Sequence, residues 1–109
     1  MENNLDKVFS RFSDKWSKNI ETGKGWYSII IELNEELVKI DPNYKIYYIK
    51  EKFGGLRFNC SLHNDKATKL IDKARNKADI TCEKCGSNGT ERSVCGWICI
   101  LCNNCYGDR

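Results

Sequence analysis

The sequence predicts an α+β fold in which helices pack on a small antiparallel β-hairpin, with a zinc-ribbon-like module at the C-terminal end. Apolar residues recur at helical spacing in three segments. Two β-rich runs flank a Gly-Gly pair, and four cysteines near the end of the chain form two C-x2-C pairs. We expect residues 1–80 to form the helical and hairpin core, and residues 81–109 to form the module packed on it in one compact domain.

Three segments have the spacing of amphipathic helices. The first covers about residues 4–18, and the stretch Thr22 to Gly25 breaks it. The second begins near Trp26 and should end at the residue before Pro42, because proline disfavours helical geometry in the residue that precedes it. The third begins at residues 64–65, where an asparagine and an aspartate can each cap a helix.

The hairpin is expected from residues 44–49 and 56–62, because glycines at Gly54-Gly55 can both adopt a positive φ. If these two glycines form the turn, Lys52 lies opposite Arg57 and Lys50 lies opposite Asn59. The apolar face then consists of Ile49, Phe53, Leu56, Phe58 and Cys60. Glu51 falls on this apolar face, which requires either a cationic partner or a bulge that shifts the register by one.

Three cations, Lys50, Lys52 and Arg57, share the opposite face of the predicted hairpin and are the candidate ligand-binding residues. Like charges directly across a strand pair are destabilising. An anion bound between them would remove that cost: a phosphate, an acidic protein surface or a nucleic-acid backbone. Alternatively, both long side chains extend into water.

Four cysteines are the strongest motif. Cys82, Cys85, Cys102 and Cys105 form a C-x2-C-x16-C-x2-C pattern, within the spacing of a tetrahedral zinc site. Such all-cysteine sites are usually structural, so we expect one structural Zn²⁺ and a short hairpin between the two pairs. Cys99 also precedes Cys102 by three positions, so it could replace Cys105 as a ligand; in the preferred register it packs along a strand.

Composition indicates a cytoplasmic protein. Hydrophobic residues are 40% and charged residues 30% of the 109 residues. No run approaches the ~20 apolar residues of a membrane span, and the first residues lack the pattern of a secretion signal. Seven cysteines, an odd number, in a reducing compartment favour metal ligation over a disulfide framework. We therefore expect no membrane partner.

The order of these motifs resembles a group of small, uncharacterised bacteriophage and prophage proteins. The resemblance is carried by Gly25-Trp26-Tyr27, by the KEKFGGLRF hairpin motif of residues 50–58, and by the two C-x2-C pairs. It covers residues 25 to 105, and it implies that Cys102 and Cys105 form the second pair. The chain departs from the group at Asn59 and Cys60, where an aromatic residue is frequent. If the chain is phage-encoded, its location is the host cytosol.

The functional expectation is a binding protein and not an enzyme, since the sequence has one histidine and no recognisable catalytic motif. By analogy with phage accessory proteins, it could be a counter-defence factor that sequesters an anionic, nucleotide-like molecule or blocks a host protein. The alternative is a nucleic-acid-binding zinc-ribbon module, which a net charge of only +3 disfavours. Aromatic residues at 26, 27, 47 and 48 could form either core or a homodimer face.

Overall fold

The computed structural model describes residues 5–14 and 18–107 of the chain. A three-stranded sheet with the order β1-β2-β3 forms the body, with β1 parallel to β2 and β2 antiparallel to β3. A separate two-stranded sheet, β4-β5, belongs to the C-terminal module. The elements in chain order are α1 (Leu5–Phe9), β1 (Ile20–Glu21), the 3-10 helix η1 (Lys24–Trp26), α2 (Tyr27–Ile40), β2 (Ile46–Lys52), β3 (Gly55–Cys60), α3 (Asp65–Ala78), β4 (Thr90–Val94), β5 (Trp97–Leu101) and α4 (Asn103–Gly107).

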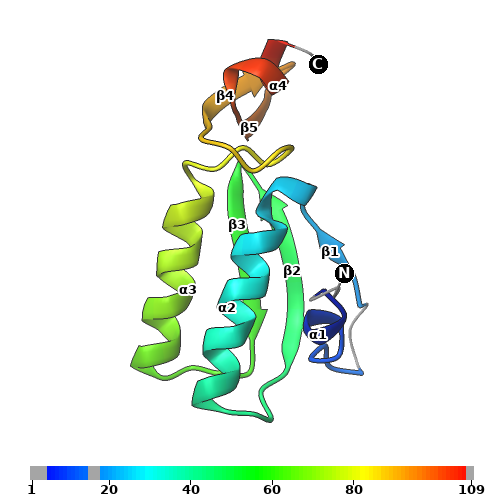
Figure 1. Ribbon diagram of the computed structural model, residues 1–109, viewed down its shortest axis with the longest axis vertical. Coiled ribbons are helices and arrows are strands. Elements are labelled where there is room, and N and C mark those ends of the chain that lie inside the picture. Colours follow the sequence, from blue (N-terminus) through cyan, green and yellow to red (C-terminus); the bar gives the residue numbers. More distant parts are fainter. Residues whose placement is uncertain (1–4, 15–17, 108–109) are drawn as a thin grey trace.

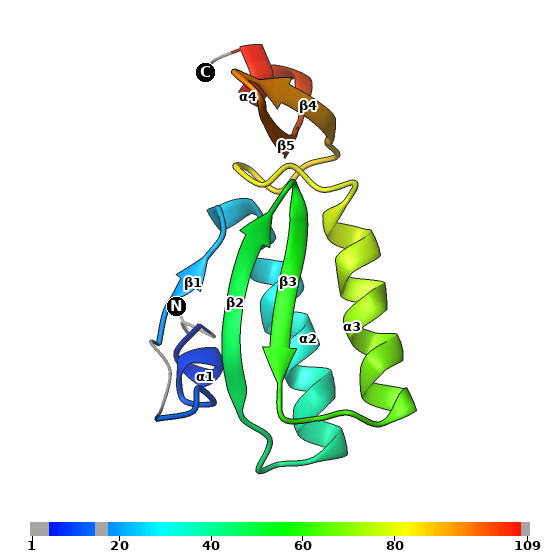
Figure 2. The ribbon, with the colours of Figure 1, turned by 180° about the vertical axis from the view of Figure 1, so that it is seen from behind.

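The body has two layers. Helices α2 and α3 lie side by side on one face of the β2–β3 hairpin, which stands in front of both helices in the reverse view (Figures 1 and 2). The C-terminal module sits beyond the turn of that hairpin, at one end of the long axis (Figure 1). This arrangement confirms the predicted α+β class, with helices on a small antiparallel sheet and a separate cysteine-containing module.

The core lies between the two layers. Its fully buried large side chains include Trp26, Ile30, Leu37, Ile49 and Leu56, drawn from η1, α2 and the hairpin. Each aliphatic side chain of this size contributes roughly 1.5–3 kcal/mol when it leaves water. The sheet therefore buries Ile49, Leu56, Phe58 and Cys60 of the predicted apolar face but not Phe53. Helix α2 ends before Pro42 as expected.

One polar pair is buried in this core. Asn34 on α2 is the buried polar residue among those described, and the Tyr44 hydroxyl donates a hydrogen bond to its Oδ1 atom. Burial raises the pKa of the Tyr44 hydroxyl, so it stays protonated and can keep donating. The pair satisfies both groups and ties α2 to the segment that leads into β2.

The predicted first helix is too long. Helix α1 spans only Leu5–Phe9, and the chain then turns to run along β2. Ser13 N–H donates to the Ile46 carbonyl at 2.8 Å, and Ile46 N–H donates to the Arg11 carbonyl at 2.8 Å. Backbone pairing with an open strand edge thus outweighs helical propensity here. Residues 15–17 of the predicted helix lie outside the described part of the chain.

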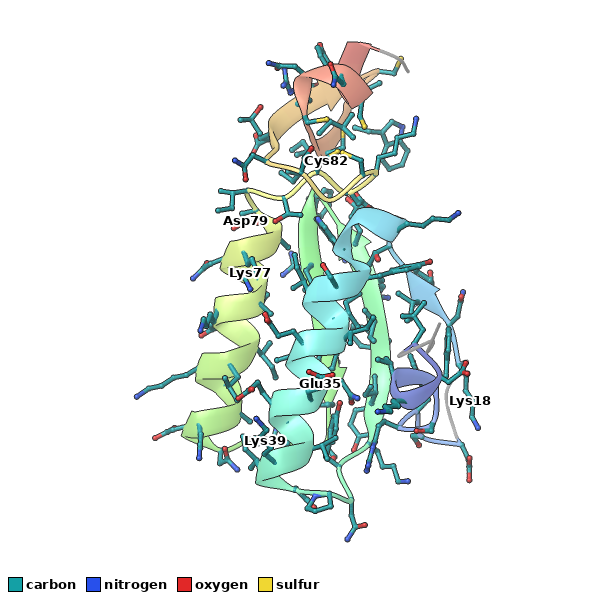
Figure 3. The ribbon with its side chains drawn as sticks, viewed as in Figure 1. Lys18, Glu35, Lys39, Lys77, Asp79 and Cys82 are labelled. Carbon is teal, nitrogen blue, oxygen red and sulfur yellow. The ribbon has the colours of Figure 1, made fainter. Side chains whose placement is uncertain are left out.

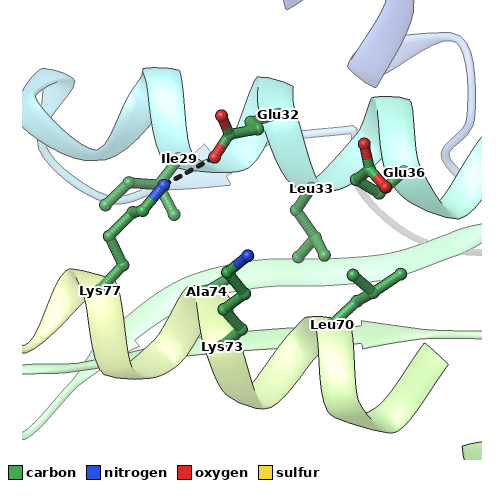
Figure 4. Close-up of a pocket in the computed structure, with 8 residues that line it drawn as sticks. All are labelled: Ile29, Glu32, Leu33, Glu36, Leu70, Lys73, Ala74 and Lys77. Carbon is green, nitrogen blue, oxygen red and sulfur yellow. Dashed lines mark hydrogen bonds and ion pairs between the residues drawn. The ribbon is translucent and has the colours of Figure 1, made fainter. Parts of the chain in front are cut away.

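Helix α3 follows the prediction more closely. Asn64 is its cap, since its Oδ1 atom accepts from the Ala67 backbone N–H at 2.8 Å. On the outer side of the molecule α3 and α2 border a groove, where Lys77 donates to Glu32 at 2.7 Å (Figure 4). This hydrogen bond and the lysine charge lower the pKa of Glu32. The pair is exposed, so it adds at most about 1 kcal/mol.

The hairpin turn lies one residue earlier than predicted, which shifts the strand pairing by two residues. Lys52 pairs with Gly55, Lys50 pairs with Arg57, and the turn residues are Phe53 and Gly54. Both turn residues have positive φ, 55° and 77°, which is the requirement of a two-residue turn that matches strand twist. Lys52 therefore does not face Arg57, and Phe53 leaves the predicted apolar face, with 73% of its surface exposed.

Glu51 provides a reason for this register. Its Oε2 atom accepts a hydrogen bond from the Gly54 backbone N–H at 2.7 Å, so the carboxylate closes the turn. A two-residue turn at Phe53-Gly54 brings these groups together. The Glu51 carboxylate on the apolar face thus needs neither a cationic partner nor a bulge at its own position. The irregularity in the β2–β3 pairing lies elsewhere, between Ile46 and Tyr48.

We expect Phe53→Asn to raise the free energy of unfolding by about 0.5–1 kcal/mol. Asparagine adopts left-handed backbone geometry more readily than phenylalanine, and the exposed ring contributes little burial. Urea denaturation measures the change. The matched control is Trp97→Asn, which removes an aromatic ring that is 77% exposed without positive φ. A loss of stability in Phe53→Asn larger than in the control would contradict this account of the turn.

Candidate functional site

The four cysteines of the two C-x2-C pairs come together. The Sγ atoms of Cys82, Cys85, Cys102 and Cys105 all lie within 4.8 Å of one another. Four sulfurs bound about 2.3 Å from one tetrahedral ion would be about 3.8 Å apart. The separation of the Cys85 and Cys102 Sγ atoms, 3.7 Å, matches that spacing. These four side chains could therefore hold one metal ion, at the junction of module and body where Figure 3 labels Cys82.

Backbone hydrogen bonds fold the first pair into a tight loop. Gly86 N–H donates to the Cys82 carbonyl at 2.9 Å, and Cys82 N–H donates to the Ser87 carbonyl at 2.6 Å. Gly86 has a φ of 87°, a conformation that only glycine adopts readily, so a glycine is needed here for the chain to reverse. The loop directs Cys82, which is fully buried, and Cys85, which is exposed, toward one point.

The second pair sits at the start of α4. The Cys105 backbone N–H donates to Cys102 Sγ at 3.4 Å, and the Tyr106 N–H donates to the Cys102 carbonyl at 2.9 Å. The Cys105 backbone hydrogen bond is the main cause that lowers the pKa of the Cys102 thiol, to about 6. The hydrogen bond with Cys102 raises the pKa of the Cys105 thiol to about 12. The cluster therefore favours thiolate at Cys102, the form that binds metal.

The other cysteines lie outside this cluster. Cys99 belongs to β5, and its thiol contacts the Arg92 carbonyl at 3.8 Å. Cys60 is buried in the body, where burial raises the pKa of its thiol. Cys95 is an exposed residue in the β4–β5 turn. The grouping thus brings Cys105, and not Cys99, together with the other three candidate ligands. Strands β4 and β5 form the hairpin expected between the two pairs.

The first cysteine loop packs directly on the body through two glycines. Gly25 N–H donates to the Glu83 carbonyl at 2.7 Å, and Gly23 N–H donates to Glu83 Oε2 at 3.0 Å. A Cβ atom added to Gly25 would lie 2.1 Å from the Cys82 carbonyl oxygen, and one added to Gly23 would lie 2.3 Å from the Glu83 carbonyl oxygen. Any larger residue would push the loop away. The buried Trp26 adds a hydrogen bond from its Nε1 atom to the Thr81 carbonyl at 2.9 Å.

Sequence reasoning missed this contact. The available signal was the short spacing of Gly23, Gly25 and Trp26, which was interpreted only as a helix break. A glycine pair immediately before a buried tryptophan can also indicate close approach of two backbone segments. Nothing in the local pattern says which segment approaches, because the partner lies about sixty residues further along the chain.

The three predicted ligand-binding cations separate into two locations. Lys50 lies opposite Arg57, and its Nζ atom is 4.6 Å from the centre of the Tyr48 ring. Lys52 and Arg57 line a groove of about 410 Å³ between the edge of β3 and α3. Among the residues described, no ion pair or side-chain hydrogen bond neutralises any of the three. All three residues remain candidate ligand-binding residues. Arg57 belongs to both locations, because it lies opposite Lys50 and also lines the groove with Lys52.

Within the described residues, no helix is long and apolar enough to cross a membrane. No protein-family model, no curated protein and no solved structure matches the chain. The cysteine cluster and the hairpin cations are therefore the features from which a function can be inferred.

We expect Cys105→Ser to lose its bound metal and Cys99→Ser to retain one ion per chain. The serine hydroxyl is a much poorer ligand than a thiolate, whereas Cys99 lies outside the cluster. The measurement is titration with Co²⁺, whose absorption reports tetrahedral thiolate coordination. Equal loss of the cobalt spectrum in both variants would mean that Cys99 also ligates.

Gly25→Ala should lower the free energy of unfolding by roughly 1–3 kcal/mol, since the added methyl group overlaps the Cys82 carbonyl oxygen. Gly107→Ala is the matched control, because no atom lies within 4 Å of a Cβ atom there. Urea denaturation of both variants in the metal-loaded state gives the comparison. Equal stability of the two variants would show that the glycine contact is not under steric constraint.

Proposed function

We propose that the chain is a small zinc-binding accessory protein of the phage type that acts by binding an anionic ligand. The carrying observation is the placement of Lys50 directly opposite Arg57, where neither side chain forms an ion pair with any described residue. Like charges across a strand pair cost stability unless something offsets them. Glu21 is in register with Lys50 on the other side, yet no ion pair joins the two among the described residues.

The proposed metal is one structural Zn²⁺. Tetrahedral sets of four sulfurs hold zinc or iron, and an all-cysteine set leaves no open coordination position for chemistry. The same thiolates require a reducing compartment, which supports a location in the cytosol. In this proposal the metal stabilises the module and the ligand binds elsewhere, at Lys50, Lys52 and Arg57.

The biological context comes from the resemblance to phage and prophage proteins. A small binding protein in that setting could act as a counter-defence factor, either by sequestering an anionic molecule of the host or by blocking a host protein. The three cations, which have no ion pair among the described residues, support sequestration of an anionic molecule. The exposed Phe53 and Trp97 would support blocking of a host protein, since aromatic residues are frequent hot spots of protein interfaces.

Nucleic acid is the second candidate, and one observation favours it. Tyr48, Lys50 and Arg57 lie on the strand positions that alternate with the buried Ile49 and Phe58, so they share the hairpin face turned away from the helices. Aromatic and basic side chains on a sheet surface can bind single strands. The candidate predicts an affinity that falls steeply as salt rises.

Native mass spectrometry of protein purified without added metal tests the proposal. We expect one zinc per chain, together with an anionic small molecule that is lost from Arg57→Glu but retained by Lys39→Glu, a charge reversal at an exposed site on α2. A protein that holds zinc and binds neither small anions nor an acidic host protein would contradict the proposal. Binding to DNA or RNA at low salt would support the second candidate instead.

A further inference from the structure

The groove between the β3 edge and α3 combines features that the hairpin cations alone do not explain. Its walls bring together residues from the hairpin turn, from β3 and from the second half of α3. At about 410 Å³ it falls within the size range of small-molecule sites. Arg57 of β3 and Arg75 of α3 both line it, so two arginines from different elements border one space.

Within the described part of the chain, neither arginine side chain has a hydrogen-bonding or ion-pair partner. Among the described residues, no side-chain hydrogen bond or ion pair within 4.0 Å involves Arg57, Arg75 or Lys52, although Asp72 and Asp79 line the same groove. Guanidinium groups present paired N–H donors that match two phosphate oxygens at once. Three cations and two carboxylates leave the groove with one net positive charge. That balance suits a small anion better than a polymer of phosphates.

Phe53 places an aromatic ring at the same groove. The residue lines it and is 73% exposed, while its φ of 55° costs roughly 1 kcal/mol or more in a residue with a Cβ atom. A turn needs only glycine or asparagine at this position, so the ring is held there at a cost to stability. Its Lys52 neighbour lies with Nζ 5.8 Å from the ring centre. An exposed ring beside cations can stack on a heterocyclic base.

The other polar residues of the groove, Asp72, Asn76 and Asp79, suit the base edge and the sugar of a molecule that carries a heterocyclic base. Asn76 lines the groove with an amide that carries both donors and an acceptor, the combination that pairs with the edge of a base. Asp72 and Asp79 can accept hydrogen bonds from sugar hydroxyls, and their charge directs a phosphate toward the arginines. Inorganic phosphate would use none of these groups.

We propose that this groove binds a nucleoside phosphate, with the base stacked on Phe53, the phosphate held by Arg57 and Arg75, and Asn76 facing the base edge. The inference rests on the proposed function and deepens it, because it names the class of anion and adds residues of α3 and of the turn. Lys50 lies outside the groove and is not required for this binding.

The experiment is isothermal titration of the metal-loaded protein with AMP, GMP, CMP and UMP, with ribose 5-phosphate and pyrophosphate as probes that lack a base. We expect at least one mononucleotide to bind about fivefold or more tightly than ribose 5-phosphate, since base stacking on an aromatic ring contributes at least that factor. Arg75→Gln should weaken nucleotide binding about tenfold or more through loss of charge-assisted hydrogen bonds. Lys73→Gln is the control, because it removes an equal charge from the other side of α3.

Phe53→Ser separates the nucleoside phosphate from other anions. It should weaken the nucleotide about fivefold or more and leave ribose 5-phosphate unchanged; circular dichroism confirms the fold of each variant. Equal affinity for nucleotides and ribose 5-phosphate, or no effect of Phe53→Ser, would overturn the inference and leave the anion-binding proposal intact. Binding of none of these anions, nor of larger nucleotides such as dinucleotides, would overturn the inference; if the protein also bound no acidic host protein, the proposed function would be overturned with it. Tighter binding of oligonucleotides with a steep salt dependence would overturn the inference in favour of the nucleic-acid surface.

Discussion

The packing of the Cys82–Glu83 backbone against the Gly23–Gly25 backbone is the contact on which the arrangement of this molecule depends. No side chain fits at Gly25, since a single methyl group there would overlap a carbonyl oxygen. The same loop supplies two of the four clustered thiols. A metal ion that fixes the loop would therefore also fix the surface on which η1 and its buried Trp26 rest. Metal binding of this kind contributes directly to folding free energy in small domains.

A second contact links the module to the hairpin turn. A Cβ atom added to Gly54 would lie 2.9 Å from Cγ2 of Ile98 on β5, so the turn and the module touch closely at this point. Ile100 of β5 is buried with the core residues of the body. The turn that presents Phe53 is thus held from inside by the Glu51 carboxylate and from outside by the module. The module acts as a support for the hairpin end, and the groove with Arg57 and Arg75 lies beside that support.

Much of this fold could be predicted because its signals are local. The apolar stripe of α2, the Asn64 cap of α3 and the cysteine spacing are each encoded within a few residues of the elements that they specify. The hairpin was predicted correctly as an element, but its turn was placed one residue too late and its pairing was wrong by two residues, because Gly54-Gly55 is the better turn by intrinsic preference. The structure places Phe53 in the turn, where the Glu51 carboxylate accepts from Gly54 N–H. That hydrogen bond was not weighed against glycine preference.

The remaining differences arise from contacts between distant segments. The helix predicted to residue 18 ends at Phe9 because the backbone at residues 11–13 pairs with Ile46. The glycine contact with the cysteine loop and the meeting of Arg57 with Arg75 have the same origin, since neither partner is near the other in sequence. Spacing identifies candidate residues, but it does not say which surface each one meets.

Hydrogen exchange with and without metal tests most directly whether the metal site secures the contact between module and body. Gly25 N–H and Glu83 N–H are bonded to the Glu83 and Ile100 carbonyls, at 2.7 and 2.9 Å. After removal of the metal with a chelator, the account predicts fast exchange at both amides, with continued protection of the amides in the middle of α2. Unchanged protection of Gly25 and Glu83 in the metal-free protein would contradict it, because the contact would then persist without the ion.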